Sequence, residues 1–381
     1  MKIGIVTFHF SDNFGAALQA YALRAFLLEE GHDARFVNYS PAHVEKGGRF
    51  RIGFSKKTWI ANLKVAYLKF NAIRSERYGN TTQKEEFSTF RTKWLGLNGP
   101  RYDSLEDLRQ ISEHFDLLIC GSDQIWSPSV QEGLDPAYFL DFGVEPVRRI
   151  SFAASFGSAT IDSLRESGAT QLMAKLDSIA VREKNGVGLV TQLTGRVADW
   201  VCDPTCLLQS YDSLIGSVEN EGENGHVFCY ALRSDQGVRE VAMSVANLLD
   251  TKLIAPANPF SRWSAIGETR YPGPAGWLSL ISRSKFVVTN SFHGTMFSVL
   301  LRKPFIVVGL PGKKVGLNDR MISLLERLGL YDRFLPAGDP ESAMHLLSKE
   351  IDWDAVGVKL ADWRDSSIDY LRREINLSAK K

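Results

Sequence analysis

The stretch KFVVTNSFHGTMFSVLL (285–301) constrains the fold more than any other part of the chain. Its apolar first part predicts a short buried strand, and the apolar spacing from Thr295 onward predicts a helix. Asn290 and Ser291, which lie between them, are residues that favour turns and helix caps. His293 is therefore expected at the junction between a strand and the helix that follows it.

Two interpretations of this junction fit the residues. The first backbone N–H groups of a helix have no partner within the helix, and the helix dipole favours an anion there. A histidine in that place can donate to a phosphate or move a proton near neutral pH. In the simpler interpretation Asn290 or Ser291 caps an ordinary helix and His293 points to solvent. The spacing of the apolar residues does not distinguish between these two interpretations.

Length and composition indicate a soluble protein of two domains. The chain has 381 residues, 44% of them hydrophobic and 23% charged, which is typical of globular proteins. A formal net charge of +1 gives no overall basic field, so we expect no nucleic-acid partner. The N-terminal MKIGIVTFHF lacks the apolar core of a signal peptide, and no apolar window is long enough to span a membrane. We expect a cytoplasmic protein.

The four cysteines (Cys120, Cys202, Cys206 and Cys229) are scattered in apolar surroundings. Cys202 and Cys206 are four positions apart, a spacing that fits neither a C-x-x-C redox pair nor a zinc site without a second ligand pair. We expect reduced, structural thiols and no metal site.

The first half of the chain begins as a β–loop–α–β unit. Residues 2–7 and 34–39 predict strands, and residues 15–30 predict the helix between them. The first loop carries Asp12 and Asn13 at the helix entrance. It does not read G-x-G-x-x-G, so the dinucleotide fingerprint is absent.

An insertion of different character occupies about 42–101. A basic loop is followed by an amphipathic helix over 59–77, in which basic residues alternate with Trp59, Tyr67 and Phe70. General principles favour a helix packed on the first domain with its basic face in solvent. The alternative is that the basic 46–77 region contacts a membrane or a polyanionic glycolipid, at the inner face of the membrane.

Polar residues follow the next buried strand directly. The strand 115–120 leads into Gly121-Ser122-Asp123-Gln124-Ile125-Trp126, and the carboxyl ends of parallel strands are where open α/β sheets bind ligands. Asp123 is a candidate base and Trp126 a candidate platform for stacking on a sugar. In the simpler interpretation Ser122 and Asp123 only cap a turn.

The second half repeats the α/β rhythm after a linker at 216–225. Strands and helices alternate through 285–301, a glycine- and lysine-containing loop at 309–314 and a helix to Leu328. A charged helix over 353–375 ends the chain. Two similar parallel α/β halves imply a cleft between them.

Six motifs in this order and spacing resemble the polysaccharide pyruvyl transferase family. They are VTFHFSDNFGAALQAYAL, GSDQIW, SFAASFG, VREKNG, VCDPTCLL and TNSFHGTMFSVLLRKPFIVVG. The resemblance runs from Ile3 to about Gly329.

The resemblance implies an α/β fold of two Rossmann-like lobes similar to the glycosyltransferase type B fold. Residues 1–215, with the helical insertion, would form the acceptor lobe, and 226–352 the donor lobe. Residues 353–381 would form a helix crossing back to the N-terminal lobe. The implied reaction transfers the pyruvyl group of phosphoenolpyruvate to two sugar hydroxyls as a cyclic ketal, in bacterial exopolysaccharide or capsule synthesis. Phosphoenolpyruvate would be the co-substrate, with no metal or other cofactor.

The family's catalytic histidine matches His293, and its arginine at the V-R-E/D strand end matches Arg182. Many relatives carry arginine two positions before the histidine, where this chain has Ser291. The second positive charge for the donor would then come from Arg320 or from the Lys313-Lys314 pair.

These residues suggest one active site. The donor phosphate would bind at the helix start, formed by Ser291, Gly294 and Thr295. Arg182 and Arg320 would share the two anionic ends of phosphoenolpyruvate, and His293 would be the general acid. Asp123 would be the base. The residues expected to hold the acceptor, a sugar on a lipid or polymer precursor, are Asp12, Asn13, Gln124 and Trp126.

Two other functions stay open on the same scaffold. One is a nucleotide-sugar glycosyltransferase, for which Trp263 and Glu268 are the candidate base- and ribose-binding residues. The other is a relative that binds anionic glycans without turnover, which the missing arginine suggests.

Overall fold

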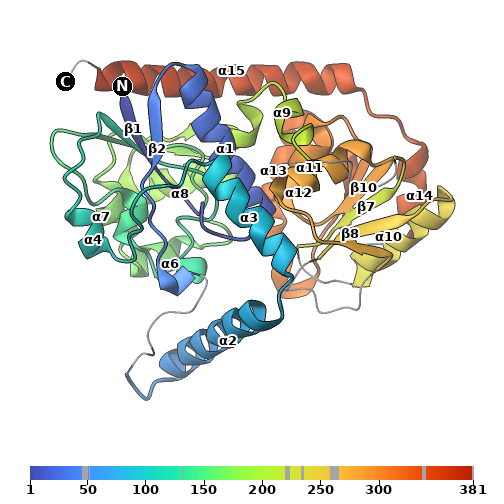
Figure 1. The fold of residues 1–381 in the computed structure, drawn as a ribbon, viewed down its shortest axis with the longest axis horizontal. Helices are drawn as coiled ribbons and strands as arrows, with labels where there is room; N and C mark the ends of the chain where they lie inside the picture. The colour runs from blue at the N-terminus through green and yellow to red at the C-terminus, as the bar shows by residue number, and fades with distance from the viewer. Residues whose placement is uncertain are drawn as a thin grey trace. The chain divides into compact units, whose positions relative to one another are not determined.

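The computed structural model describes residues 1–44, 50, 52–131, 133–218, 224–232, 236–257, 266–336 and 340–379. For residues 57, 64, 71, 75, 76, 78, 313 and 314 only the backbone is described. The chain divides into two compact units: unit 1 comprises Met1–Gly79, Arg91–Leu208 and Arg364–Lys381, and unit 2 comprises Asn80–Phe90 and Gln209–Trp363. Figure 1 shows the elements of both.

Unit 1 is built on a parallel sheet of four strands in the order β2-β1-β3-β4. Its strands are β1 (Lys2–Val6), β2 (Asp33–Phe36), β3 (Leu117–Cys120) and β4 (Arg148–Ser151), with a parallel pair β5 (Ala180–Val181) and β6 (Asp199–Trp200) beyond β4. Its helices are α1 (Phe14–Glu29), α2 (Lys56–Tyr78), α4 (Leu105–Arg109), α5 (Pro128–Gln131), α6 (Ile161–Glu166), α7 (Ala169–Met173) and α8 (Lys184–Thr194), with 3₁₀ turns η2 (Pro136–Phe139) and η3 (Pro204–Cys206). The central strand β3 (LLIC) is buried along its whole length, as a strand covered on both faces must be.

Unit 2 is built on a parallel sheet of six strands in the order β12-β11-β10-β7-β8-β9. Its strands are β7 (Val227–Tyr230), β8 (Leu253–Pro256), β9 (Glu268–Arg270), β10 (Phe286–Thr289), β11 (Phe305–Val308) and β12 (Phe334–Leu335). Its helices are α9 (Asp212–Ile215), α10 (Gln236–Leu248), α11 (Pro274–Arg283), α12 (Phe292–Leu300), α13 (Asp319–Leu328) and α14 (Pro340–Ser348), with 3₁₀ turns η4 (Gly312–Leu317) and η5 (Tyr331–Arg333).

Each sheet reverses its winding direction at one place. In unit 1 the chain runs from β1 to β2 on one side and returns to β3 on the other side of β1. In unit 2 it runs from β7 through β8 to β9 and returns to β10 on the other side of β7. The carboxyl ends of the strands beside such a reversal diverge into loops on opposite faces, which is where open α/β sheets bind their ligands.

The last helix, α15 (Trp353–Ser378), begins in unit 2 and ends in unit 1. Within unit 1 the Ser367 hydroxyl accepts a hydrogen bond from the backbone N–H of Cys202 (2.9 Å), and the Tyr370 hydroxyl donates to the Ser151 carbonyl (3.0 Å). Arg372 and Glu30 add a two-pronged ion pair. These contacts fasten the end of the chain to the N-terminal unit, as the resemblance implied.

The sequence prediction differs from the structure at several boundaries. Residues 80–90 belong to unit 2, where Gln83 Nε2 donates to the Pro272 carbonyl (3.2 Å), so the insertion does not lie wholly in the N-terminal unit. The helix that contains all of them except Asn80, α3 (Thr81–Lys93), ends in unit 1. The edge strand β9 was missed because its sequence, Glu-Thr-Arg, carries no apolar pattern. Among the described residues no helix is long and apolar enough to cross a bilayer.

Candidate functional site

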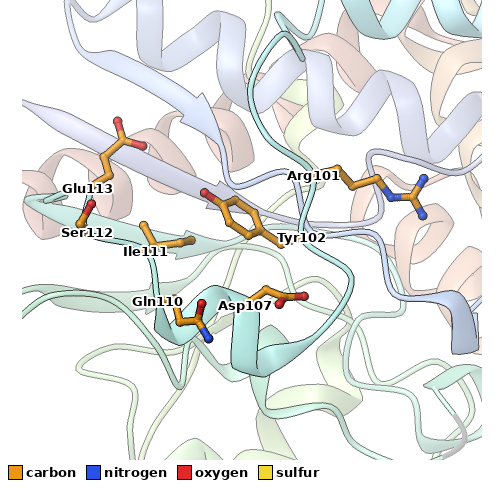
Figure 2. Close-up of a pocket in the computed structure, with 7 residues that line it drawn as sticks. All are labelled: Arg101, Tyr102, Asp107, Gln110, Ile111, Ser112 and Glu113. Carbon is orange, nitrogen blue, oxygen red and sulfur yellow. The ribbon is translucent and has the colours of Figure 1, made fainter.

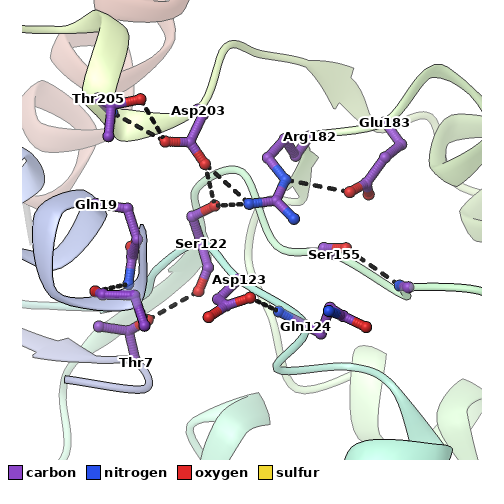
Figure 3. A network of polar contacts seen from close by, with 12 residues as sticks. Thr7, Gln19, Ser122, Asp123, Gln124, Ser155, Arg182, Glu183, Asp203 and Thr205 are labelled. Carbon is purple, nitrogen blue, oxygen red and sulfur yellow. Dashed lines mark hydrogen bonds and ion pairs between the residues drawn. The ribbon is translucent and has the colours of Figure 1, made fainter. Parts of the chain in front are cut away.

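In unit 1, a threonine side chain joins β1 and β3, the two strands between which the sheet reverses its winding direction. The Thr7 hydroxyl, just past β1, donates a 2.8 Å hydrogen bond to the carbonyl of Ser122, just past β3 (Figure 3). Gln19 on α1 donates to the same hydroxyl at 2.9 Å. The loop after β3 is thereby fixed against β1 and α1 at the carboxyl edge of the sheet.

Asp123, the predicted base, follows on this loop in a left-handed backbone conformation (φ 77°). Such a conformation is uncommon outside glycine, although aspartate tolerates it better than most residues. Its carbonyl accepts from the N–H of Ser155 (3.0 Å), and its carboxylate accepts from the N–H of Gln124 (2.8 Å). Neighbouring loops therefore hold a strained residue in place at the strand ends, a pattern that is frequent at functional sites.

A buried charge network lies next to Asp123 (Figure 3). Arg182 Nη1 donates to Asp203 Oδ2 (2.9 Å) and to the Ser122 hydroxyl (3.1 Å), and its Nε donates to Glu183 (3.1 Å). Ser122 also donates to Asp203 (2.9 Å). The loops after β3, β5 and β6 are joined by this one guanidinium.

Burial opposes the charge of Arg182, but the carboxylates of Glu183, Asp203 and Asp123 outweigh it and raise the pKa of Arg182 above its ordinary value. The side chain is fully shielded from solvent. Arg182 was predicted to bind the donor. Its guanidinium instead lies inside unit 1, where it contacts the side chains of Ser122, Glu183 and Asp203. Through Ser122 it fixes the loop that carries Asp123.

Trp126 was predicted to offer its ring to a sugar, and the structure contradicts this. The indole is fully buried, its Nε1 donates to the Tyr138 carbonyl (2.9 Å), and it stacks on Phe139 with a centroid distance of 5.2 Å. A ring covered in this way packs the core of unit 1.

The other predicted acceptor residues lie at the same edge of unit 1. Gln124 is partly exposed beside Asp123. Asn13 caps α1, its side chain accepting from the N–H of Ala16 (3.1 Å). Asp12 is exposed and pairs with Arg91 (2.8 Å).

His9 is a titratable residue at this edge that sequence reasoning missed. It is fully buried; Nδ1 lies 2.9 Å from the Thr7 carbonyl and Nε2 lies 3.1 Å from Asn38 Oδ1. Burial lowers its pKa to about 4. The sequence did offer a reason to consider His9, because it lies two residues after Thr7 in the loop that follows the first predicted strand.

The reversal in unit 2 is bridged in the same way. The Thr289 hydroxyl at the end of β10 donates to the Tyr230 carbonyl at the end of β7 (2.7 Å) and accepts from the N–H of Ser291 (3.0 Å). Asn290 Oδ1 accepts from the N–H of Leu232 (2.8 Å). The loop that leads to His293 is thus tied to the neighbouring strand on both sides of the turn.

Ser291 begins α12 as its cap, which places the helix start earlier than the sequence predicted. Its hydroxyl accepts from the N–H of Gly294 (3.4 Å), and its carbonyl accepts from both the N–H and the hydroxyl of Thr295. His293 therefore lies in the first turn and is largely buried. A Cβ on Gly294 would come within 2.3 Å of the Thr289 hydroxyl, so glycine there serves packing of the junction. Ser291 in place of the family's arginine supplies the cap.

Three arginines lie at or after the carboxyl ends of strands in the unit 2 sheet. Arg239 lies in the first turn of α10, after β7, and Arg320 in the first turn of α13, after β11. Arg270 is the last residue of β9 and pairs with Glu268 (2.6 Å). The Nε atoms of Arg239 and Arg270 are buried and, among the described residues, have no hydrogen-bond partner. Arg239 and Arg270 were not among the predicted residues; the side chain of Lys313, which was, lies outside the described part.

A pocket of about 410 Å³ elsewhere in unit 1 is lined by Arg101, Tyr102, Asp107, Gln110, Ile111, Ser112 and Glu113 (Figure 2). Glu113, at one end, pairs with Lys2, the first residue of β1 (2.7 Å). That end therefore lies at the amino edge of the sheet, opposite the edge that carries Asp123. None of the predicted site residues lines this pocket.

In the part of the chain that the structure describes, no three His, Cys, Asp or Glu side chains gather as a metal site would require. The four cysteines are buried and form no disulfide with one another. Metal-independent chemistry stays a prediction. Of the residues proposed for a nucleotide, Trp263 lies outside the described residues and Glu268 is engaged with Arg270.

Comparison with known proteins gives a family and a fold. A family model described as "Polysaccharide pyruvyl transferase" matches residues 13–310. The structure is similar to S. aureus MnaA, solved with UDP (13% identity, 99% of this chain and 98% of that chain, TM-score 0.51). It is also similar to Arabidopsis thaliana UGT89C1 (11% identity, 100% and 99%, TM-score 0.50). At these identities the likeness shows the fold, which is the α/β glycosyltransferase type B fold that the sequence predicted. No curated protein matches the sequence.

Proposed function

The chain belongs to the polysaccharide pyruvyl transferase family, and on that premise we propose that it moves the pyruvyl group of phosphoenolpyruvate onto two hydroxyls of a sugar. The observation that carries the proposal is the position of His293. It lies in the first turn of α12, beside the reversal of the unit 2 sheet, with arginines on the neighbouring connections. That edge combines a proton donor with positive charge, which a doubly anionic donor needs.

Phosphoenolpyruvate carries a phosphate and a carboxylate, so two cationic contacts are required. We assign them to Arg239 and Arg320, which begin the helices after β7 and β11, on either side of β10. This assignment replaces Arg182. It also accounts for Ser291, which stands where many relatives carry an arginine. The positive charge of that missing arginine is supplied by arginines that follow the neighbouring strands. Lys313 remains a further predicted contact.

The proposed reaction balances without a redox partner. His293 delivers a proton to the methylene carbon of phosphoenolpyruvate, which leaves a cationic centre at C2. One sugar hydroxyl forms a C2–O bond, the C2–O bond to phosphate breaks, and the second hydroxyl forms the second C2–O bond. Of the two hydroxyl protons, one restores the histidine, and the other is taken up by a base and ends on inorganic phosphate.

We assign the acceptor to the carboxyl edge of unit 1, with Asp123 as the base that receives a hydroxyl proton. The partial exposure of Asp123 and its strained backbone support this role. Asp12, Asn13 and Gln124 would bind the sugar. The proposed acceptor is a lipid-linked or polymer-precursor glycan of a bacterial surface polysaccharide.

The test combines two readouts. The protein is incubated with phosphoenolpyruvate and lipid-linked galactose-, mannose- and glucose-type acceptors, while phosphate release and the pyruvylated product are measured by colorimetry and mass spectrometry. We expect one acceptor to yield both signals, and His293→Ala to yield neither although it remains folded. Near-normal turnover by His293→Ala would remove the catalytic role. Glycosyl transfer from a nucleotide sugar would instead favour a type B glycosyltransferase.

A further inference from the structure

Helix α2 of unit 1 (Lys56–Tyr78) turns its apolar side to solvent. Trp59 is 66% exposed and Phe70 63%, and four more large apolar side chains on this helix are each more than half exposed: Ile60, Leu63, Tyr67 and Ile73. Residues three, four or seven positions apart lie on one face of a helix, so these side chains form a continuous stripe. Val65, on the opposite side, is fully buried.

This finding corrects the favoured interpretation of the insertion. The sequence suggested a helix packed through its apolar face with basic residues in solvent, whereas here the apolar face itself is exposed. The helix is nonetheless well started: the Ser55 hydroxyl accepts from the N–H of Thr58 (3.1 Å) as a cap does. In an ordinary soluble monomer, contiguous exposed apolar surface of this extent marks a binding site.

The segment before α2 extends the surface. Ile52 and Phe54 are fully exposed, and Phe50 is about half exposed with the Lys69 ammonium 4.9 Å from the centre of its ring. The neighbouring residues 45–49 and 51 lie outside the described part. Apolar side chains thus continue beyond the end of the helix on a segment that is itself basic in sequence.

Charge identifies the partner. Between Lys56 and Tyr78 the sequence has six Lys or Arg residues and one Glu, in a chain whose net charge is only +1. Lys56 and Arg77 are exposed and lie on the apolar face by helical spacing. Aromatic and aliphatic residues on one face with Lys and Arg among and around them are the pattern of a helix that lies in the interface of an anionic bilayer.

We propose that α2 is an interfacial helix that binds the surface of an anionic lipid bilayer, with Trp59, Leu63 and Phe70 inserted among the acyl chains and the basic residues at the headgroups. The competing occupant is a second copy of the chain. Pairing two α2 stripes would bring two strongly basic helices together, and like charges at close range oppose that. An anionic membrane offers both the apolar medium and the opposite charge.

Flotation with vesicles tests the proposal, using the full-length protein without substrate. We expect it to float with phosphatidylcholine vesicles that contain phosphatidylglycerol and to remain unbound with phosphatidylcholine alone. Leu63→Ser/Phe70→Ser should lower the partition coefficient at least about tenfold, because two inserted side chains are removed. Lys56→Glu/Arg77→Glu should lower it roughly fivefold or more for each charge. The matched control Val197→Ser/Leu377→Ser, exposed apolar residues of unit 1 outside α2, should bind as wild type does.

Insertion itself has a separate readout. Vesicles with brominated acyl chains should quench the fluorescence of Trp59, and Trp59→Phe should float normally but lose that part of the quenching. Binding that survives Leu63→Ser/Phe70→Ser, or the absence of quenching from Trp59, would overturn the proposal. So would a concentration-dependent dimer that these substitutions dissociate, with no vesicle binding. Because no substrate is used, these outcomes are independent of whether the protein transfers pyruvyl groups.

Discussion

The hydroxyl of Thr289 donates a 2.7 Å hydrogen bond to the carbonyl of Tyr230, across the place where the unit 2 sheet reverses direction. The hydroxyl of Thr7 does the same in unit 1, donating to Ser122 at 2.8 Å. Both units thus use one buried threonine to join the strands beside which a parallel sheet offers its binding crevice. In each case the loop fixed by the threonine carries a proposed catalytic residue, His293 or Asp123.

Replacing Thr289 by valine keeps the shape and removes the hydroxyl. The Tyr230 carbonyl and the Ser291 N–H would lose a buried partner, each at a cost of about 1–3 kcal/mol. We expect the free energy of unfolding, measured with urea, to fall by about 2–4 kcal/mol. Thr191→Val, at an exposed helix position, is the control and should change it by less than about 0.5 kcal/mol. Equal effects at the two sites would contradict a joining role.

Arg239→Ala and Arg320→Ala should each raise the KM for phosphoenolpyruvate about 10- to 100-fold, since a charge-assisted hydrogen bond contributes about 1.5–3 kcal/mol. Steady-state phosphate release at varied donor concentration measures this. Arg302→Ala removes an exposed cation just before β11, at the amino edge of the same sheet, and should leave KM unchanged. If all three variants behaved alike, the donor would not be bound at the carboxyl edge.

Asp123→Asn should lower kcat about 10²- to 10⁴-fold, the usual contribution of a general base. Asparagine tolerates the left-handed backbone, and its oxygen can still accept from the N–H of Gln124, so the melting temperature should hardly move. Asp250 also has a positive φ (46°) and is exposed in unit 2, which makes Asp250→Asn a matched control. Full turnover by Asp123→Asn would leave this residue as a turn former only.

His9 makes stability depend on pH. The unfolded chain binds its proton with an ordinary pKa of 6.5, whereas burial lowers the pKa in the folded chain to about 4. Acid therefore favours the unfolded state, and the stability that His9 contributes above pH 6.5 is lost as pH falls from 6.5 to 4. The loss amounts to about 3 kcal/mol.

The measurement compares urea unfolding of wild type and His9→Gln over that pH range. The difference between the two should shrink as pH falls, because glutamine has no proton to bind. His114→Gln, at a half-exposed histidine, should run parallel to wild type. Parallel curves for His9→Gln as well would show that the His9 proton is not linked to folding.

Local pattern was enough to predict the strand–turn–helix at His293 and the buried strand before Asp123, because apolar runs and capping residues act over a few positions. The burial of Arg182 and its hydrogen-bond partners could not be predicted from local pattern. Its partners Ser122 and Asp203 lie 60 and 21 positions away in the chain, and only the folded sheet brings their loops together. Trp126 was misjudged for the same reason, since Phe139, which covers its ring, comes from the 3₁₀ turn η2.

The orientation of α2 shows a second limit. Amphipathic spacing predicted the helix correctly, yet both of its sides carry apolar and basic residues, so the pattern did not say which side the protein covers. Burial of Val65 and exposure of Phe70 settle that question. The cations at the unit 2 edge were missed because Arg239 and Arg270 stand in no motif and are related only by sheet order.

Calorimetric titration of phosphoenolpyruvate tests the central claim, that the carboxyl edge of unit 2 binds this donor, most directly. Wild type should bind phosphoenolpyruvate and not UDP-glucose, Arg239→Ala and Arg320→Ala should weaken binding at least about tenfold, and Arg302→Ala should bind as wild type does. Binding of UDP-glucose without phosphoenolpyruvate, or donor binding that is unaffected by both edge arginines, would contradict the account.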